Sequence, residues 1–221
     1  ANNYIFTGTC RAGTGVVAAV TSYLAERDCS ICALEQFDDD STDKFFMRAV
    51  FRPQDGSPSI DSIRESFAEV SAKFAMDWHI HDPKVPVKTL IMVSKYDHCL
   101  DDILYRRRKG EFNMEITAVV SNHVDLRAMV EREGIAFIHL PVTKDTKPQQ
   151  EQRLLEIVNE TGTELVILAR YMQILSNELS AQLSGRCINI HHSFLPGFKG
   201  AKPYHQAYER GVKVIGATAH Y

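Results

Sequence analysis

The chain has 221 residues, 44% of them hydrophobic and 24% charged, and its 25 basic and 28 acidic residues give a formal net charge of −3. This balance is ordinary for a globular protein and argues against nucleic-acid binding, which needs a clustered basic excess. No run of about 18 apolar residues could cross a membrane, and the first residues do not resemble a signal peptide. We therefore expect a cytoplasmic protein with neither a nucleic-acid nor a membrane partner.

Five cysteines are scattered along the chain, an odd number that fits a reducing compartment better than a disulfide scaffold. Cys29 and Cys32 have the C-x-x-C spacing, but no second pair follows them. Cys32 lies in the apolar run 31–34, so we expect buried structural thiols rather than a redox pair.

The first 82 residues predict the order strand, helix, strand, strand, helix, strand. Apolar residues recur every three or four positions in the two expected helices. The expected strands cover residues 4–8, 30–37, 45–52 and 75–81, and the expected helices cover 16–26 and 59–74. This order predicts a small βαββαβ, ferredoxin-like domain.

Residues 83–86, with two prolines, form the expected linker to a second domain at 87–221. Strands and helices alternate in this domain, which predicts a doubly wound, mostly parallel α/β sheet. The expected strands cover 87–94, 115–121, 135–140, 165–169 and 186–190, and the expected helices cover 97–109, 125–133, 148–161 and 177–183. Ligands of such sheets bind beyond the carboxyl ends of the strands.

Asn189 and His191 stand two residues apart where the last of these strands ends. On an extended segment both side chains project to one side. An amide donor beside an imidazole suits stabilisation of the oxyanion of an acyl-transfer intermediate, with His191 as proton donor. Alternatively, Asn189 bonds a neighbouring loop and His191 is a buried histidine with a structural partner.

The segment around these two residues resembles the folate-dependent formyltransferase family, whose hallmark is Asn-x-His followed by Ser-x-Leu-Pro. Asn189, His191, Ser193 and Leu195 match in order. The resemblance implies that Asn189 and His191 are catalytic and that Ser193 and Leu195 bind substrate.

Residues 165–176 resemble the strand and loop that line the folate pocket of this family. The resemblance implies that the pterin lies against Met172 and Ile174, with backbone groups around Gln173 and Leu175 bonding its edge. The alternative for Met172 and Ile174 is core packing, since apolar residues at period two are commoner in cores.

Two features favour the branch of this family that passes the formyl group to water. The turn 94–99 has no glycine to cradle the phosphate of glycinamide ribonucleotide, and Asp97 reads most simply as an N-cap. Residues 1–82 resemble the N-terminal ACT domain of that branch, which is regulatory and oligomerising. Arg11 and Ala12 replace the usual Pro and Asp of the ACT turn, which weakens the expectation of an amino-acid effector.

The implied reaction is hydrolysis of 10-formyltetrahydrofolate to tetrahydrofolate and formate, which balances one-carbon pools for purine synthesis. The resemblance implies a catalytic Asp beyond Tyr221, so we expect the second domain to be incomplete at its C-terminus. It also places His220 at the edge of the site, orienting that Asp, although a simple strand histidine is the alternative. No metal site is expected, and no cofactor other than the folate substrate.

Two other functions stay open at this point. The chain could be a folate-binding or amino-acid-sensing module without catalysis, or it could transfer the formyl group to an amine such as glycinamide ribonucleotide. Exposed strand edges in small βαββαβ domains commonly pair, so we expect a homo-oligomer, a dimer or tetramer, formed through residues 1–82.

Overall fold

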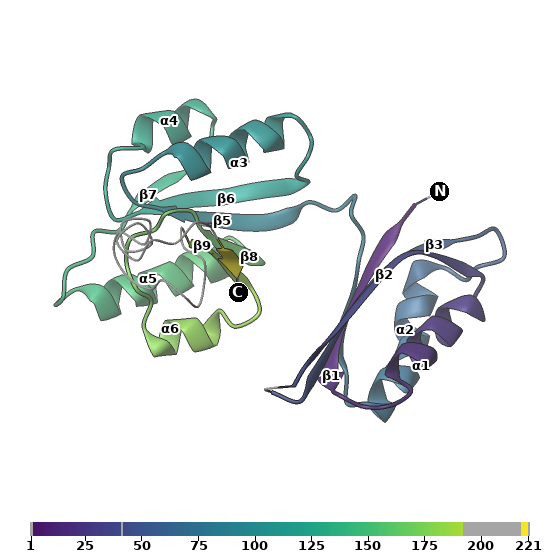
Figure 1. Cartoon of the computed structure of the whole chain (residues 1–221). Helices are drawn as coiled ribbons and strands as arrows, with labels where there is room; N and C mark the ends of the chain where they lie inside the picture. Colours follow the sequence, from purple (N-terminus) through teal and green to yellow (C-terminus); the bar gives the residue numbers. More distant parts are fainter. Residues whose placement is uncertain (1, 41, 192–217, 221) are drawn as a thin grey trace, which may run out of the picture. The chain divides into compact units, whose positions relative to one another are not determined.

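A computed structural model describes residues 2–40, 42–191 and 218–220 of the chain. It divides into two compact units, Ala1–Val85 and Pro86–Tyr221. Each unit has its own sheet and its own hydrophobic core (Figure 1). Within the described residues, no helix is long and apolar enough to cross a membrane.

The first unit has the expected order of elements, with an antiparallel sheet in the order β2-β3-β1-β4. Both helices cover the same face of this sheet (Figure 1). The elements are β1 (Tyr4–Arg11), α1 (Val16–Ala25), β2 (Cys29–Asp39), β3 (Lys44–Pro53), α2 (Ile60–Lys73) and β4 (Asp77–His81). Ser59 caps α2, because its side chain accepts a hydrogen bond from the backbone N–H of Ser62.

Strict alternation in β3 supplies the strand side of the first core. Phe45, Met47, Ala49 and Phe51 are buried, while the residues between them face the other side. From α2, the fully buried Phe67 meets three aromatic rings edge-on; they belong to Phe6, Tyr23 and Trp78, with centroids 4.7–5.1 Å away. Such edge-to-face contacts add to the free energy gained by burying the rings.

Strand β2 is one of the two edge strands of this sheet, and it corrects one expectation. Cys32 is exposed, not buried, because a register shift between Ile31 and Ala33 places it at a bulge. Further along the strand, Phe37 is 61% exposed and stacks on its cross-strand neighbour Phe46 on the face that the helices leave open.

The second unit is a doubly wound sheet in the order β10-β9-β8-β5-β6-β7. Its strands pair in parallel, except that β10 runs antiparallel to β9. The strands are β5 (Val87–Val93), β6 (Met114–Ser121), β7 (Phe137–His139), β8 (Leu165–Leu168), β9 (Cys187–His191) and β10 (Thr218–His220). The helices are α3 (His98–Arg108), α4 (Arg127–Arg132), α5 (Lys147–Glu160) and α6 (Asn177–Gln182).

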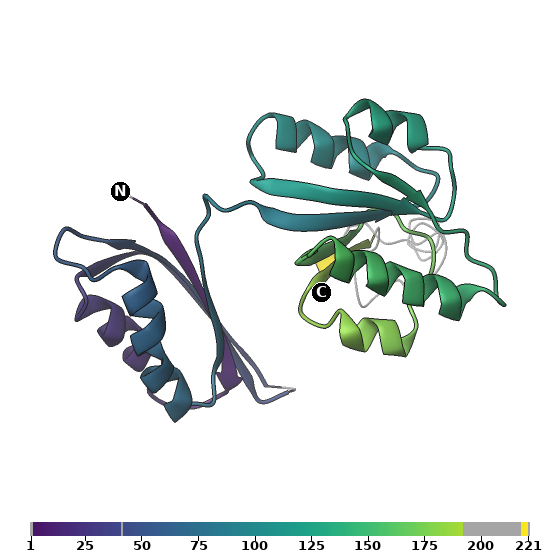
Figure 2. The same ribbon diagram turned by 180° about the vertical axis from the view of Figure 1, so that it is seen from behind.

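Helices cover both faces of this sheet, which explains its near-continuous apolar strands. Helices α3 and α4 lie on one face, and α5 and α6 lie on the other (Figures 1 and 2). Alternate residues of β5 therefore belong to different cores: Ile91 and Val93 pack with α3 and α4, while Leu90 and Met92 pack with α5 and α6.

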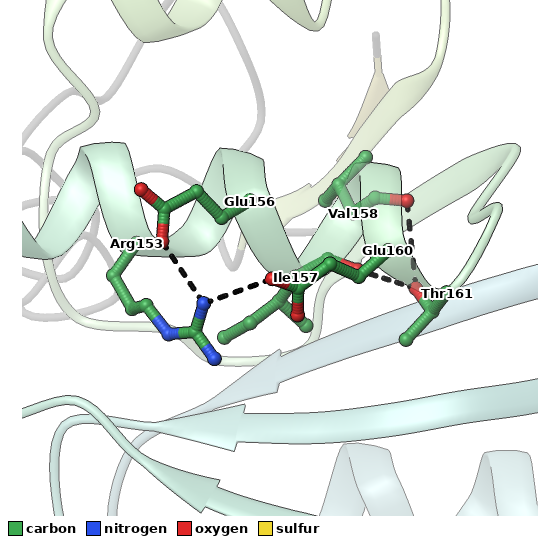
Figure 3. Close-up of polar contacts among 6 residues, drawn as sticks. All are labelled: Arg153, Glu156, Ile157, Val158, Glu160 and Thr161. Atoms are coloured by element: carbon green, nitrogen blue, oxygen red, sulfur yellow. Dashed lines mark hydrogen bonds and ion pairs between the residues drawn. The ribbon is translucent and has the colours of Figure 1, made fainter.

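The C-terminal end of α5 is held by polar contacts at the amino-end side of the sheet. Arg153 donates to Glu156 and Glu160 on the outer face of the helix, and these bonds raise the pKa of its guanidinium (Figure 3). The Thr161 hydroxyl donates to the carbonyl of Ile157 at 2.6 Å and also bonds the hydroxyl of Thr163 at 2.7 Å. The helix end thus leads directly into β8.

Candidate active site

Strand order reverses in the second unit between β5 and β8. The chain passes from β5 outward through β6 and β7, then returns to the other side of β5 with β8 and β9. The segments that leave β5 and β8 therefore diverge at their carboxyl ends, and open α/β sheets bind ligands at such a point. Ser94 follows β5 directly, and residues 169–176 follow β8.

Strand β9 brings the first predicted catalytic pair to this edge. Asn189 is half-buried and lies opposite Leu168, the last residue of β8, while His191 ends β9. The backbone of β10 pairs antiparallel with β9 and sets His220 opposite Asn189 and Thr218 opposite His191. Two predicted substrate-binding residues, Ser193 and Leu195, lie outside the described residues.

Arg170 turns the chain out of the sheet after β8. Its φ of 62° lies in the left-handed region, which non-glycine residues adopt at a cost of about 1 kcal/mol or more. Its guanidinium lies over the ring of Tyr96, 5.2 Å from the ring centre, and its buried Nε has no hydrogen-bond partner within the described part of the chain. Strained residues of this kind are concentrated at functional sites.

The loop after Arg170 exposes two apolar side chains. Met172 is 53% exposed and Ile174 is 85% exposed, so the core-packing alternative for this pair is wrong. The loop also lines a small pocket, to which it contributes Tyr171, Gln173, Ile174 and Leu175. The rest of the lining comes from β5, β6, the segment after β7, α5 and α6, namely Met92, Val120, Leu140, Val142, Lys147, Gln150, Glu151, Leu154 and Leu179. Neither Met172 nor Asn189 lines this pocket.

Tyr171 lines the same pocket and packs against the core formed with α5 and α6. Burial, together with the nearby Glu151 carboxylate, raises the pKa of its hydroxyl to about 12. The ring therefore stays neutral at ordinary pH and holds the start of the loop against the sheet.

Two hydrogen bonds fix the loop at both ends, and sequence reasoning assigned no role to the side chains that make them. The Met172 backbone N–H donates to the Ser94 hydroxyl at 2.9 Å, and the Ser176 N–H donates to the Glu151 carboxylate at 2.9 Å. The feature of the sequence that could have marked Ser94 is its position: its hydroxyl directly follows a strand that ends in five consecutive buried residues. Its partner could not be read from the sequence, because Met172 lies 78 positions away.

The turn after β5 corrects a second expectation. Asp97 stands at the N-cap position of α3, but its side chain makes no capping hydrogen bond. Its backbone is already helical, with φ −96° and ψ −23°, whereas a capping side chain normally comes from an extended residue. The backbone carbonyl of Asp97 instead accepts the first helical bond from Asp101.

The side chains in the part of the chain that the structure describes do not form a metal-binding site. No group of three or more His, Cys, Asp or Glu side chains there could hold a metal ion. His79 and His81 lie on the same side of β4 with their ring centres 6.3 Å apart, without a third ligand beside them.

Comparison with known proteins identifies the second unit. Residues 87–221 match a family model described as formyl transferase. A phosphoribosylglycinamide formyltransferase from Bacillus halodurans has a similar fold, with a TM-score of 0.57, 27% identity, and coverage of 61% of this chain and 71% of that chain. The fold and the polar pair on β9 thus define a member of the formyl transferases.

Relatives that match along the whole chain are more specific. A formyltetrahydrofolate deformylase from Corynebacterium sp. (strain P-1) is 51% identical over 218 residues, covering 99% of this chain and 76% of the relative. The crystal structure of a formyltetrahydrofolate deformylase from Burkholderia mallei matches with a TM-score of 0.86 and 50% identity, covering 100% of this chain and 78% of that one. The chain belongs to the formyltetrahydrofolate deformylase family.

The buried hydroxyl of Tyr171 predicts a loss of stability in alkali. An unfolded tyrosine ionises near pH 10, whereas Tyr171 in the folded chain ionises at about 12, so the folded state holds its proton longer. The stabilisation is complete below pH 10 and is lost as the pH rises towards 12. Tyr171→Phe has no hydroxyl to ionise at this position. Urea unfolding should therefore show the wild type losing more free energy of unfolding than the variant between pH 10 and 12. Parallel losses in the two proteins would contradict the burial of this hydroxyl.

Proposed function

We propose that this chain hydrolyses 10-formyltetrahydrofolate to tetrahydrofolate and formate. The observation that carries the proposal is the meeting of two features at one sheet edge: Asn189 on β9, and the exposed apolar pair Met172 and Ile174 after β8. Exposed apolar side chains beside a polar pair fit a flat heteroaromatic ring such as a pterin. Relatives at 37–51% identity carry the name of this activity.

The proposed reaction needs a donor at the developing oxyanion, a proton for the leaving amine and a carboxylate that activates the water. The oxygen of a water molecule attacks the formyl carbon, and Asn189 donates to the oxyanion of the tetrahedral intermediate. The bond from this carbon to N10 then breaks. The carboxylate that activates the water takes one of its two protons and releases it to solvent. His191 gives its proton to N10 and regains the other proton of the water, so formate and tetrahydrofolate leave with all protons accounted for. We propose that His220 orients the carboxylate that activates the water.

The pterin itself is proposed to lie against Met172 and Ile174. Backbone groups around Gln173 and Leu175 would then bond its edge, and Ser193 and Leu195 would complete the binding site from the next segment. The two fixed ends of the loop support this assignment, because backbone groups select a ligand only when their positions are fixed.

Water rather than an amine is the proposed acceptor. Transfer to glycinamide ribonucleotide requires a phosphate site, and close backbone approach to a phosphate needs glycine. The turn 94–99 has none, and it carries Asp97 at the start of α3. A negative charge there opposes an anionic substrate.

The role of Asn189 predicts a large loss of rate. With the full-length protein, Asn189→Ala should release formate from 10-formyltetrahydrofolate about 100- to 1000-fold more slowly, as expected for the loss of one oxyanion donor. Asn159→Ala, an exposed change in α5, is the matched control and should leave the rate unchanged. Undiminished turnover of Asn189→Ala would overturn its role.

The same assay separates the other two functions. Binding of the folate without formate release by the wild type would favour a non-catalytic module. Product that forms only after glycinamide ribonucleotide is added would favour transfer to an amine.

We further propose that residues 1–82 form an ACT-like regulatory and oligomerising domain, joined by the linker 83–86 to the catalytic domain at 87–221. The antiparallel βαββαβ arrangement supports this assignment. Strand β2 supports association: it is a long edge strand, and the exposed pair Phe37 and Phe46 lies on it and its neighbour. Edges of this kind pair readily with a second copy.

Replacing Phe37 tests the association. We expect a dimer or tetramer in solution, and Phe37→Lys should shift it towards the monomer, because edge lysines oppose strand pairing. Phe112→Lys, which changes a partly exposed phenylalanine of the second unit, is the control. Light scattering at micromolar concentration measures both. A monomeric wild type, or an unchanged mass for Phe37→Lys, would contradict the proposal.

An amino-acid effector would bind at the start of α1. Gly13, Gly15 and Val16 line a hollow there, with Gln36 and Asp38 of β2 opposite them. Gly15 precedes α1 with a φ of 87°, and the first backbone N–H groups of a helix have no partner within the helix, so those of α1 suit a carboxylate. Calorimetric titration with the common amino acids should show saturable heat for at least one of them. No heat from any of them would remove the effector from the proposal.

A further inference from the structure

Ser94 lies at the centre of a buried polar network on the carboxyl edge of the second sheet. It is 2% exposed, and its hydroxyl donates to Oδ1 of Asn122 at 2.6 Å while it accepts from the Met172 N–H at 2.9 Å. Both capacities of this hydroxyl are therefore used inside the protein. Ser121 adds a bond from its hydroxyl to the carbonyl of Ser94 at 3.4 Å.

The network reaches across four strand ends. Asn122 follows β6 and is itself 8% exposed, and its backbone carbonyl oxygen lies 3.4 Å from Nε2 of His139 on β7. Ser94 follows β5, and Met172 belongs to the loop after β8. The hydroxyl of Ser94 thus joins the two diverging segments at the reversal of strand order to the buried residue Asn122.

Ser94 fixes the start of the loop after β8. Arg170 leaves the sheet in a left-handed conformation, and the next fixed backbone group is the Met172 N–H. The following fixed group is the Ser176 N–H on Glu151, and between the two lies Ile174, 85% exposed. Without the Ser94 hydroxyl, the backbone of the residues proposed to bind the pterin would lose one of its two hydrogen bonds to side chains of the frame.

We propose that Ser94 is a positioning residue for the substrate: it fixes the backbone of residues 172–175 in the geometry that binds the folate. The proposal rests on the proposed function for the identity of the ligand. Ser94 acts through Met172 and touches neither the reacting carbon nor N10. It should therefore govern how tightly the folate binds and have little effect on the chemical step.

Ser94→Ala tests this in the full-length protein. The KM for 10-formyltetrahydrofolate and the Kd for tetrahydrofolate should each rise about tenfold, near the upper worth of one hydrogen bond, while kcat stays within about threefold. An unchanged Kd, or a fall in kcat with an unchanged KM, would overturn the proposal.

Thr163→Val is the matched control at the opposite edge of the sheet. Thr163 is 4% exposed, and its hydroxyl bonds those of Thr117 and Thr161, both at 2.7 Å. Both variants lose a buried hydroxyl with two partners, so both should lower the urea midpoint of unfolding. Only Ser94→Ala should weaken folate binding. Equal weakening by Thr163→Val would show that general destabilisation, not positioning, causes the effect.

A second pair of variants examines the other end of the loop. Glu151→Ala removes the acceptor for the Ser176 N–H, whereas Glu151→Gln keeps a side-chain oxygen there. If both ends position the same segment, Ser94→Ala and Glu151→Ala should change the Kd non-additively in the double variant, and Glu151→Gln should restore most of the affinity. Strict additivity would contradict a shared segment.

Amide hydrogen exchange without any folate separates this proposal from the proposed function. In Ser94→Ala, exchange of residues 171–175 should become faster than in the wild type, and in Thr163→Val it should not. If the wild type neither binds nor hydrolyses the folate but the exchange results are as expected, the proposed substrate is wrong and the positioning role of Ser94 stands. An unchanged exchange rate in Ser94→Ala would show that Ser94 does not fix the backbone of this loop.

Discussion

The parallel pairing of β8 with β5 is the constraint on which the candidate site depends. Residues 89–92 of β5 lie opposite residues 165–168 of β8, and β9 continues the sheet beyond β8. Because strand order reverses at this pairing, the chain leaves β5 and β8 in opposite directions and opens the sheet edge between them. Asn189, Ser94 and the loop after Arg170 meet there although they are far apart in sequence.

Much of this arrangement could be predicted from the sequence, since local patterns carry it. Alternating apolar residues define β3, the spacing of three and four defines α2, and the alternation of strands with helices defines the parallel sheet. The strand bearing Asn189 was placed correctly for the same reason. Asn189 and His191 are polar residues at the end of an apolar strand, and this polarity also indicated which edge of the sheet carries the candidate site.

The rest depends on contacts between distant segments, which no local pattern reveals. The side chain of Cys32 is exposed because a bulge shifts the register, and Asp97 does not cap its helix because its backbone has already become helical. Met172 and Ile174 have the same period as core residues, yet they are exposed on the loop that follows the left-handed turn at Arg170. The bond from Ser94 to Met172 closes over 78 positions and could be found only in the folded chain.

The packing of Trp78 has a consequence for any study of this protein in solution. It is the only tryptophan of the 221 residues, and its partly buried ring packs against the first core with its centre 4.7 Å from that of Phe67. Tryptophan fluorescence excited at long wavelength therefore arises from the first unit alone, whereas circular dichroism reports helices of both. The emission spectrum and the dichroism signal, followed together during unfolding, would show whether the two units melt in one step or in two.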